Sequence, residues 1–199
     1  MIQSVNKYHI YEILSAEALY DDISENNDEY FIGSIICIPL GDAINPYLEV
    51  IDGQQRLTTI SLFLTAIYTR LKEHKDEMSE DDEDVLPSLR KSLKSKNSPN
   101  EMKLVPQVQN YNLDDFNHLM NGVALRKASA SKHPYYAQRK IARCYNYFLK
   151  RIDKEIESLN DESVVDFLLG KYNKVKQAML VKIGSKGIDF SGTIDCFGV

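Results

Sequence analysis

An abrupt change of hydrophobic periodicity at Gly53 constrains the fold of this 199-residue chain more than any other feature. The five residues from Tyr47 to Ile51 form a short, mostly apolar run without a helical period. Beyond Gly53, apolar residues recur at steps of three and four, at Leu57, Ile60, Phe63, Leu64, Ile67 and Leu71. Such steps place side chains on one face of an α-helix. The sequence therefore predicts a strand, a turn at Gly53 and a helix of about five turns that begins near Gln54.

Two strands are expected before this helix. Residues 30–38 are rich in aromatic and β-branched side chains and stop at Pro39, which is typical of a mostly buried strand. This run and residues 47–51 are candidates for a hairpin. We expect a small sheet of residues 29–38, 47–52 and about 101–105, packed against the Gln54 helix.

The remaining periodic segments are helical, so the predicted fold class is α+β. A first helix is expected over about 11–24. A mainly helical part is expected over about 112–179, with Asn112 as the cap of its first helix and Ser163 or Asp161 as the cap of its last.

Composition predicts a division of the chain into four parts. These are an α/β core over 1–75, a mobile charged linker over 76–100, a strand plus helical part over 101–183, and a glycine-rich tail over 184–199. The linker is predicted because seven of the nine residues from Asp76 to Asp84 are acidic and a basic segment follows, with Arg90, Lys91, Lys94 and Lys96. The tail is expected to pack weakly or to dock as an edge against a second copy, as in a homodimer.

Several classes of function are disfavoured by composition. The net charge of -5 gives no general basic surface for nucleic acid. The three cysteines and four histidines are scattered, so neither a disulfide framework nor a zinc site is expected. No apolar run approaches the ~18 residues of a membrane span, and the N-terminus shows no signal pattern, so a cytoplasmic protein without membrane contact is expected.

The turn itself carries groups that suit phosphate. The first N–H groups of a helix have no internal partner, and the helix dipole makes that end electropositive. Gly53 lets an anion approach the backbone, and Arg56 in the first turn offers a planar fork for two phosphate oxygens. Thr58 and Thr59 add hydroxyls to the same turn. The residues thus predict a phosphate site at the start of this helix.

The other polar residues of the turn leave several roles open. The charge of Asp52 opposes phosphate, so it holds a metal ion, orients Arg56 or polarises a water. Gln54 and Gln55 suit a ribose, a base edge or an attacking water. A purely structural interpretation remains: Asp52 as helix cap, and Thr58 and Thr59 bonded back to helix carbonyls.

Two motifs carry a resemblance to a known family. The run Tyr30-Phe31-Ile32-Gly33-Ser34-Ile35 is followed by Glu49-Val50-Ile51-Asp52-Gly53-Gln54-Gln55-Arg56-Leu57-Thr58-Thr59. Together they resemble the N-terminal domain of GmrSD-type, modification-dependent restriction endonucleases of bacterial anti-phage defence. The similarity covers roughly residues 10–180 and implies a ParB/sulfiredoxin-like core around the DGQQR motif, Asp52 to Arg56.

The resemblance implies a nucleotide site coupled to cleavage of modified DNA by a nuclease domain or a partner subunit. A nucleoside triphosphate with Mg²⁺ is the implied ligand. Asp52, Gln54 and Gln55 become catalytic candidates for its hydrolysis. The implied binding residues are Gly53, Arg56, Thr58, Thr59, Gly33 and Ser34.

The chain also departs from this family pattern. The family's arginine-containing segment before the first helix has no counterpart in residues 1–10, and the chain contains no tryptophan and no His-Asn-His nuclease pattern. The expected function is therefore a nucleotide-binding regulatory domain without nuclease chemistry of its own, with NTP hydrolysis left open. A ParB-like DNA-binding module and a structural remnant are the alternatives.

Overall fold

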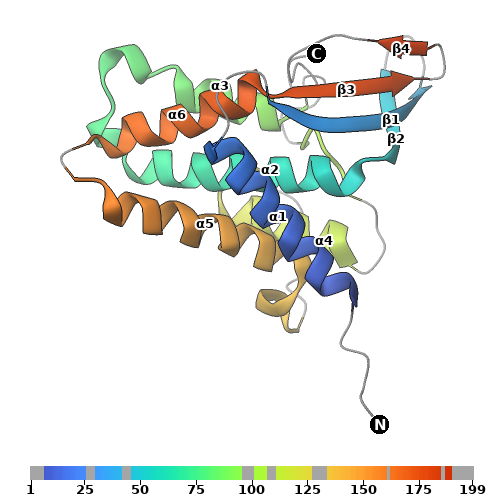
Figure 1. The fold of residues 1–199 in the computed structure, drawn as a ribbon, viewed down its shortest axis with the longest axis horizontal. Coiled ribbons are helices and arrows are strands. Elements are labelled where there is room, and N and C mark those ends of the chain that lie inside the picture. The colour runs from blue at the N-terminus through green and yellow to red at the C-terminus, as the bar shows by residue number, and fades with distance from the viewer. Residues whose placement is uncertain are drawn as a thin grey trace.

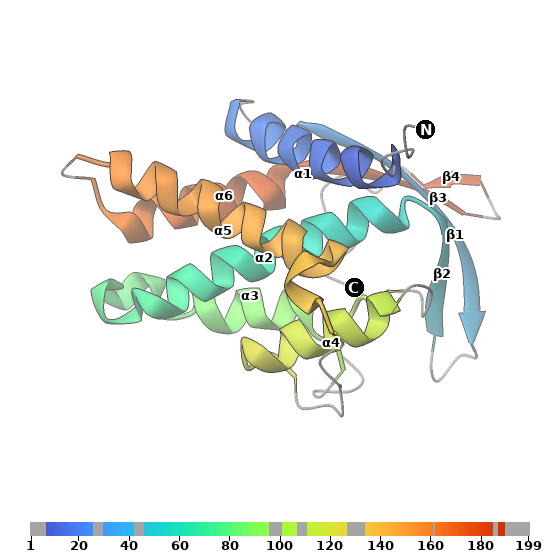
Figure 2. The ribbon, with the colours of Figure 1, turned by 90° about the horizontal axis from the view of Figure 1, so that it is seen from below.

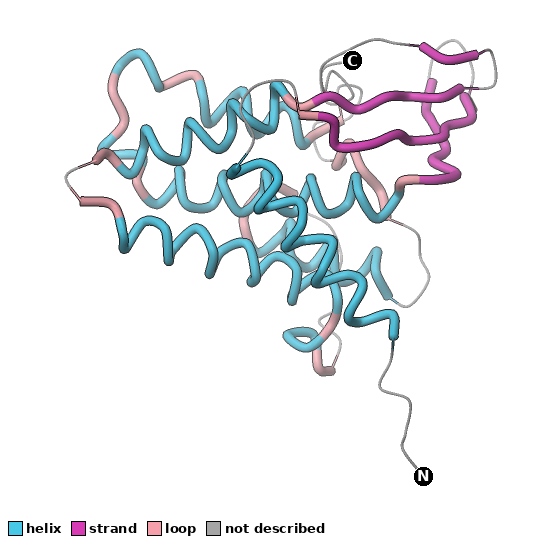
Figure 3. Tube along the Cα trace, viewed as in Figure 1, coloured by secondary structure: helices cyan, strands magenta, loops and turns pink. Residues whose placement is uncertain are grey.

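The structure is a computed structural model that describes residues 7–25, 30–41, 46–95, 101–106, 111–126, 134–160, 162–184 and 187–189. It has an α+β fold in which the strands gather at one end and helices form the rest (Figure 3). The elements are α1 (Lys7–Glu25), β1 (Phe31–Gly41), β2 (Pro46–Asp52), α2 (Gln54–Glu73), α3 (Val85–Leu93), α4 (Asn112–Gly122), α5 (Lys140–Ser158), α6 (Val164–Gln177), β3 (Met179–Gly184) and β4 (Gly187–Asp189).

Helix α2 lies at the centre of the fold and begins at Gln54, as predicted. Every residue from Thr59 to Tyr68 is buried, so the helix is enclosed around its whole circumference. It contacts α1, α3, α5 and α6, which surround it in Figures 1 and 2. The aromatic rings of Tyr20, Phe63 and Phe148 meet at the junction of α1, α2 and α5.

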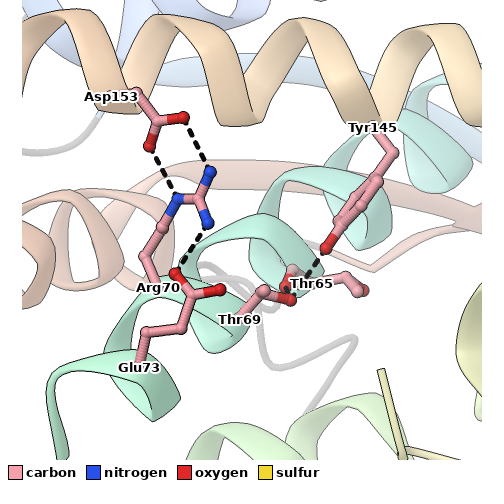
Figure 4. Close-up of polar contacts among 6 residues, drawn as sticks. All are labelled: Thr65, Thr69, Arg70, Glu73, Tyr145 and Asp153. Carbon is pink, nitrogen blue, oxygen red and sulfur yellow. Dashed lines mark hydrogen bonds and ion pairs between the residues drawn. The ribbon is translucent and has the colours of Figure 1, made fainter. Parts of the chain in front are cut away.

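Helix α5 is fixed along α2 by polar contacts as well as by apolar packing (Figure 4). The guanidinium of Arg70 donates from Nε and Nη2 to the two carboxylate oxygens of Asp153, each at 2.7 Å, and from Nη1 to Glu73 at 2.6 Å. At the preceding residue of α2, Thr69 Oγ1 and the hydroxyl of Tyr145 lie 2.9 Å apart. A two-pronged Arg–carboxylate pair has a defined geometry, so it sets the register between the two helices.

The sheet has the strand order β2-β1-β3-β4. Strands β1 and β2 form the expected antiparallel hairpin, β3 runs parallel to β1, and β4 returns antiparallel to β3. The prediction of a third strand at 101–105 is wrong, because in that segment Met102 forms only an isolated bridge with Lys94. The strand beside β1 instead comes from the end of α6, a pairing of segments nearly 150 residues apart that local sequence does not specify.

Strand β1 has two distinct faces. Ile35 and Cys37 are each 2% exposed and belong to the helical core, whereas Ile36 and Ile38 are 40% and 41% exposed. We call the face that carries Ile35 and Cys37 the inner face, and the face that carries Ile36 and Ile38 the outer face. β-Bulges interrupt the pairing of β1 with both of its neighbouring strands. Ile51 is the extra residue in the pairing with β2, and Ile32 is the extra residue in the pairing with β3. Bulges change strand direction and are frequent beside functional sites.

The prediction of a mobile linker over 76–100 is wrong for residues Val85–Leu93. That segment is helix α3, packed against α2, with Leu89 and Leu93 buried. Short 3-10 turns over Lys75–Glu77 and Glu80–Asp82 lead into it. The abundance of charge concealed the spacing of Leu86, Leu89 and Leu93, which is that of an amphipathic helix.

Two further details concern caps and the tail. Of the two caps expected for α6, Ser163 is the one observed, and it accepts a hydrogen bond from the Asp166 amide. The cap of α4 is Tyr111, and the expected cap Asn112 is already helical. Within the predicted tail, β4 pairs with β3, and residues 185–186 and 190–199 lie outside the described part of the chain.

No helix in the described ranges is both long and apolar enough to cross a bilayer.

The packing of α3 yields a stability prediction. Leu89→Ala is expected to lower the free energy of unfolding by about 2–5 kcal/mol, because it leaves a cavity between α3 and α2. The exposed neighbour Ser88 offers a control, since Ser88→Ala is expected to change it by less than about 0.5 kcal/mol. Urea denaturation followed by circular dichroism measures both, and equal midpoints would contradict a structural role for α3.

Candidate functional site: the DGQQR turn

Gly53 forms the turn between β2 and α2 with a conformation that suits glycine. It is the N-cap residue of α2, with φ 90° and ψ 7°, and no side chain caps the helix. A Cβ at this position would lie 2.6 Å from Cγ2 of Ile35 on the inner face of β1. The turn therefore needs glycine twice, for its left-handed backbone and for its close approach to β1.

Arg56 leans from the first turn of α2 onto β1. Its Nη1 donates to the backbone carbonyl of Ser34 at 2.6 Å. Gly33, with φ 130°, lies directly beneath, and a Cβ there would be 2.8 Å from Cζ of Arg56. Gly33 and Ser34 thus lie beside Arg56, as expected from their place on the neighbouring strand. The two separate sequence motifs form one interlocked unit, in which each glycine makes room for a side chain of the other motif.

This unit leaves a set of hydrogen-bond donors without acceptors among the described residues. The first helical bond of α2 runs from the Leu57 amide to the Gly53 carbonyl at 3.0 Å, so the amides of Gln54, Gln55 and Arg56 precede the helical ladder. A guanidinium has five N–H groups, and only the bond to Ser34 engages that of Arg56 within the described part of the chain. The positive end of the helix dipole lies at the same place. Such an arrangement is suited to an anion.

Three side chains of the predicted site, the catalytic candidate Gln54 and the binding candidates Thr58 and Thr59, have hydrogen-bond partners within the protein. The side-chain amide of Gln54 donates to the Val50 carbonyl and so ties the helix start to β2. Thr58 Oγ1 donates to the Gln54 carbonyl and Thr59 Oγ1 to the Gln55 carbonyl, each at 2.8 Å. In this structure their hydroxyl protons are used within the helix, as the structural alternative for these threonines predicts.

Asp52 lies on the opposite side of the sheet from Arg56. It pairs with Ile36, and paired residues share a face, so Asp52 belongs to the exposed outer face. Arg56 contacts Gly33, which alternates with the buried Ile35 and so belongs to the inner face. No ion pair joins Asp52 to Arg56 in the described structure. Asp52 is not the helix cap either, because that position is Gly53.

Gln55 is exposed, and its side chain remains a candidate for ligand contact. Among the residues described, no group of three or more His, Cys, Asp or Glu side chains is arranged to hold a metal ion. Sequence reasoning missed Ile35, the residue that makes Gly53 necessary. Its place in the quoted strand motif was visible, but its contact with the turn requires the fold.

The interlock predicts a paired response to adding a methyl group. Gly33→Ala and Gly53→Ala are each expected to lower the free energy of unfolding by about 1–3 kcal/mol, because of positive φ and the close contacts with Arg56 and Ile35. Gly170→Ala in α6 is the matched control. Nothing lies within 4 Å of its added Cβ, and it is expected to stabilise by about 0.5–1 kcal/mol. Chemical denaturation of the three variants measures this, and a loss common to all three would contradict the interlock.

The comparisons with known proteins identify the family of the chain. A search of curated proteins found no match. The family model described as the GmrSD restriction endonuclease, N-terminal domain, matches residues 11–189, a range that contains the interlocked turn and all four strands. The chain therefore belongs to the family of GmrSD restriction endonuclease N-terminal domains.

Proposed function

We propose that the DGQQR turn binds the phosphates of a nucleotide, and that the domain uses this binding to regulate a restriction activity against phage DNA. One observation carries the proposal: among the described residues, the amides of Gln54, Gln55 and Arg56 and most of the Arg56 guanidinium have no acceptor, at the positive end of a rigidly held helix. Amides at a helix start together with a fixed arginine are a recurrent phosphate-binding arrangement.

The geometry supports binding more strongly than hydrolysis. Asp52 is the only carboxylate in the DGQQR motif, and it faces the outer side of the sheet while Arg56 occupies the inner side. Gln54 is engaged with Val50, which leaves Gln55 as the side chain best placed to contact a ligand. We therefore assign the phosphate contacts to Arg56 and the first amides of α2, and no catalytic step to Thr58 or Thr59.

A magnesium ion fits this site only as a companion of the nucleotide. The described residues offer no cluster of carboxylates for an all-protein cage. Mg²⁺ is commonly held by one or two carboxylates together with phosphate oxygens and water. When bound, it would supply neutralisation of phosphate charge, and Asp52 is the nearest carboxylate in sequence.

The proposed context is a cytoplasmic defence protein in which nucleotide occupancy controls access of modified DNA to a nuclease domain or a partner subunit, including a second copy of the chain. The ParB/sulfiredoxin-like relationship of the sheet belongs to this proposal. A ParB-like DNA-binding module is the weaker candidate, because the outer face of β2 presents the carboxylates of Glu49 and Asp52 to any approaching phosphate backbone.

Replacing Arg56 tests the proposal. Arg56→Ala removes charge-assisted hydrogen bonds worth about 1.5–3 kcal/mol, so nucleotide binding is expected to weaken roughly 10- to 150-fold. Arg56→Lys is expected to recover only part, since an ammonium cannot reproduce the fork. Asp52→Asn removes a negative charge beside the helix start and is expected to tighten binding. Isothermal titration calorimetry with ATP and GTP, with and without Mg²⁺, measures all three.

The control is Lys72→Ala, which removes a positive charge from the exposed far end of the same helix. It is expected to leave binding unchanged. Circular dichroism establishes that the Arg56 variants remain folded after loss of the bond to Ser34. Unchanged nucleotide affinity in folded Arg56→Ala would show that the turn is structural and would refute the proposed function.

A further inference from the structure

Exposed apolar side chains gather on the β1–β2 hairpin. Ile36 is paired on both sides, with Asp52 of β2 and with Ile183 of β3, so its 40% exposure arises on the open outer face. The helices lie on the other side of the hairpin in Figure 2. A contiguous apolar surface marks an interaction site, whereas scattered single apolar residues are ordinary. Of the nine large hydrophobic side chains that are exposed in the described part of the chain, six lie on these two strands: Phe31, Ile36, Ile38, Leu40, Leu48 and Ile51.

Carboxylates border the apolar row on the edge strand β2. Ile36 pairs with Asp52 and Ile38 with Glu49, so the two carboxylates share the outer face with the apolar residues. Both are exposed, and neither forms an ion pair or a side-chain hydrogen bond with another described residue. The whole segment from 31 to 52 contains no lysine, arginine or histidine. We call Ile36, Ile38 and Leu40 together with Glu49 and Asp52 the hairpin patch.

The dimensions of the hairpin patch fit an α-helix laid along β1. Alternate residues of a strand are about 6.6–6.8 Å apart, so Ile36 and Leu40 are separated by about 13 Å. Residues three or four positions apart on one face of a helix are about 4.5–6 Å apart along its axis, so roughly two to three turns cover the apolar row. Strand β2 lies only about 4.8 Å to one side. Basic side chains on the flank of such a helix reach Glu49 and Asp52, and opposite charges at an interface fix the orientation of the partner.

Charge distinguishes such a partner from other occupants of the hairpin patch. In a symmetric pair of chains the same surface meets itself, so the carboxylates of one copy would lie near those of the other. Like charges brought together at an interface oppose association. The last ten residues of the chain, 190–199, include apolar side chains but contain one acidic and no basic residue, so they lack the complementary charge. A basic partner complements both the apolar row and the carboxylates.

We propose that the hairpin patch docks a basic amphipathic helix of a partner protein. The apolar face of that helix lies on Ile36, Ile38 and Leu40, and its lysine or arginine side chains pair with Glu49 and Asp52. Asp52 thereby acquires a role on the side of the sheet opposite to Arg56, because the carboxylate of the DGQQR motif faces the partner while the arginine lies on the inner face. Docking does not depend on nucleotide binding at the turn.

Nuclear magnetic resonance of the ¹⁵N-labelled full chain tests the docking with a synthetic helical peptide that carries leucine on one face and lysine on the other. The peptide is expected to shift the amides of residues 36–40 and 48–52. A peptide with glutamate in place of every lysine is expected to leave them unshifted. Glu49→Lys/Asp52→Lys is expected to weaken binding of the lysine peptide about 10-fold or more, because like charges replace opposite ones. Ile36→Thr/Ile38→Thr is expected to weaken it as well, and threonine keeps the β-branch that suits a strand.

Matched controls change the same chemistry elsewhere on the molecule. Glu157→Lys/Glu162→Lys reverses the charge of two exposed carboxylates outside the sheet, and Val105→Thr replaces an exposed apolar side chain. Both are expected to leave binding of the lysine peptide unchanged. Circular dichroism establishes that all variants remain folded.

Several outcomes overturn the proposal. They are absence of shifts at the hairpin, equal binding of the glutamate peptide, and undiminished binding by either hairpin variant. A dimer detected by light scattering that Ile36→Thr/Ile38→Thr dissociates overturns it in favour of a second copy of the chain. Peptide binding that occurs only after removal of residues 190–199 overturns it in favour of that segment. Nucleotide titration of Arg56→Ala bears on the proposed function alone, so the two proposals fail separately.

Discussion

The enclosure of α2 is the constraint on which the rest of the fold depends. A helix buried on all sides must be covered by several elements, and α1, α3, α5 and α6 supply that cover. Polar residues within the buried stretch are tolerated because their hydroxyls find local acceptors, as Thr65 does at the Ser61 carbonyl at 2.7 Å. With α2 fixed in this way, both of its ends acquire defined surroundings: the sheet and turn at its start, and α3 with the Arg70–Asp153 pair further along.

The interlock of the two motifs explains how a short turn becomes rigid enough for the binding that we propose. Gly53 lets the turn approach Ile35, and Gly33 lets Arg56 lie on β1 and reach the Ser34 carbonyl. The arginine is therefore pre-positioned before any ligand arrives, which reduces the conformational entropy lost on binding. The same contacts mean that Arg56 has a structural role beside the proposed one. For this reason partial rescue by lysine and the effect of Asp52→Asn carry more information than loss of binding in the alanine variant alone.

The separation of Asp52 from Arg56 changes the chemistry that the turn supports. From the sequence, a carboxylate four residues before an arginine at a helix start suggested a joint site. The bulge at Ile51 and the pairing of Asp52 with Ile36 direct the carboxylate to the outer face instead. This arrangement supports the proposed binding through Arg56 and gives no support to a step shared by the two residues. The basic residues of α3 changed in the opposite direction, from residues expected to lie apart to residues that lie together. The sequence placed Arg90 and Lys91 in a linker, but they line a cavity because Leu89 and Leu93 pack α3 onto α2.

The sequence by itself determined the strand–turn–helix at Gly53 and the family, and it indicated the β1–β2 hairpin and narrowed the cap of α6 to Ser163 or Asp161, because these depend on local periodicity, local capping and short motifs. Only the tertiary structure decided that β3 rather than residues 101–105 lies beside β1, that Asp52 and Arg56 occupy opposite faces, and that Arg90 and Lys91 line a cavity. These outcomes depend on contacts between segments far apart in the chain. Local propensities do not encode them, since the partner of each residue exists only after the core around α2 has formed.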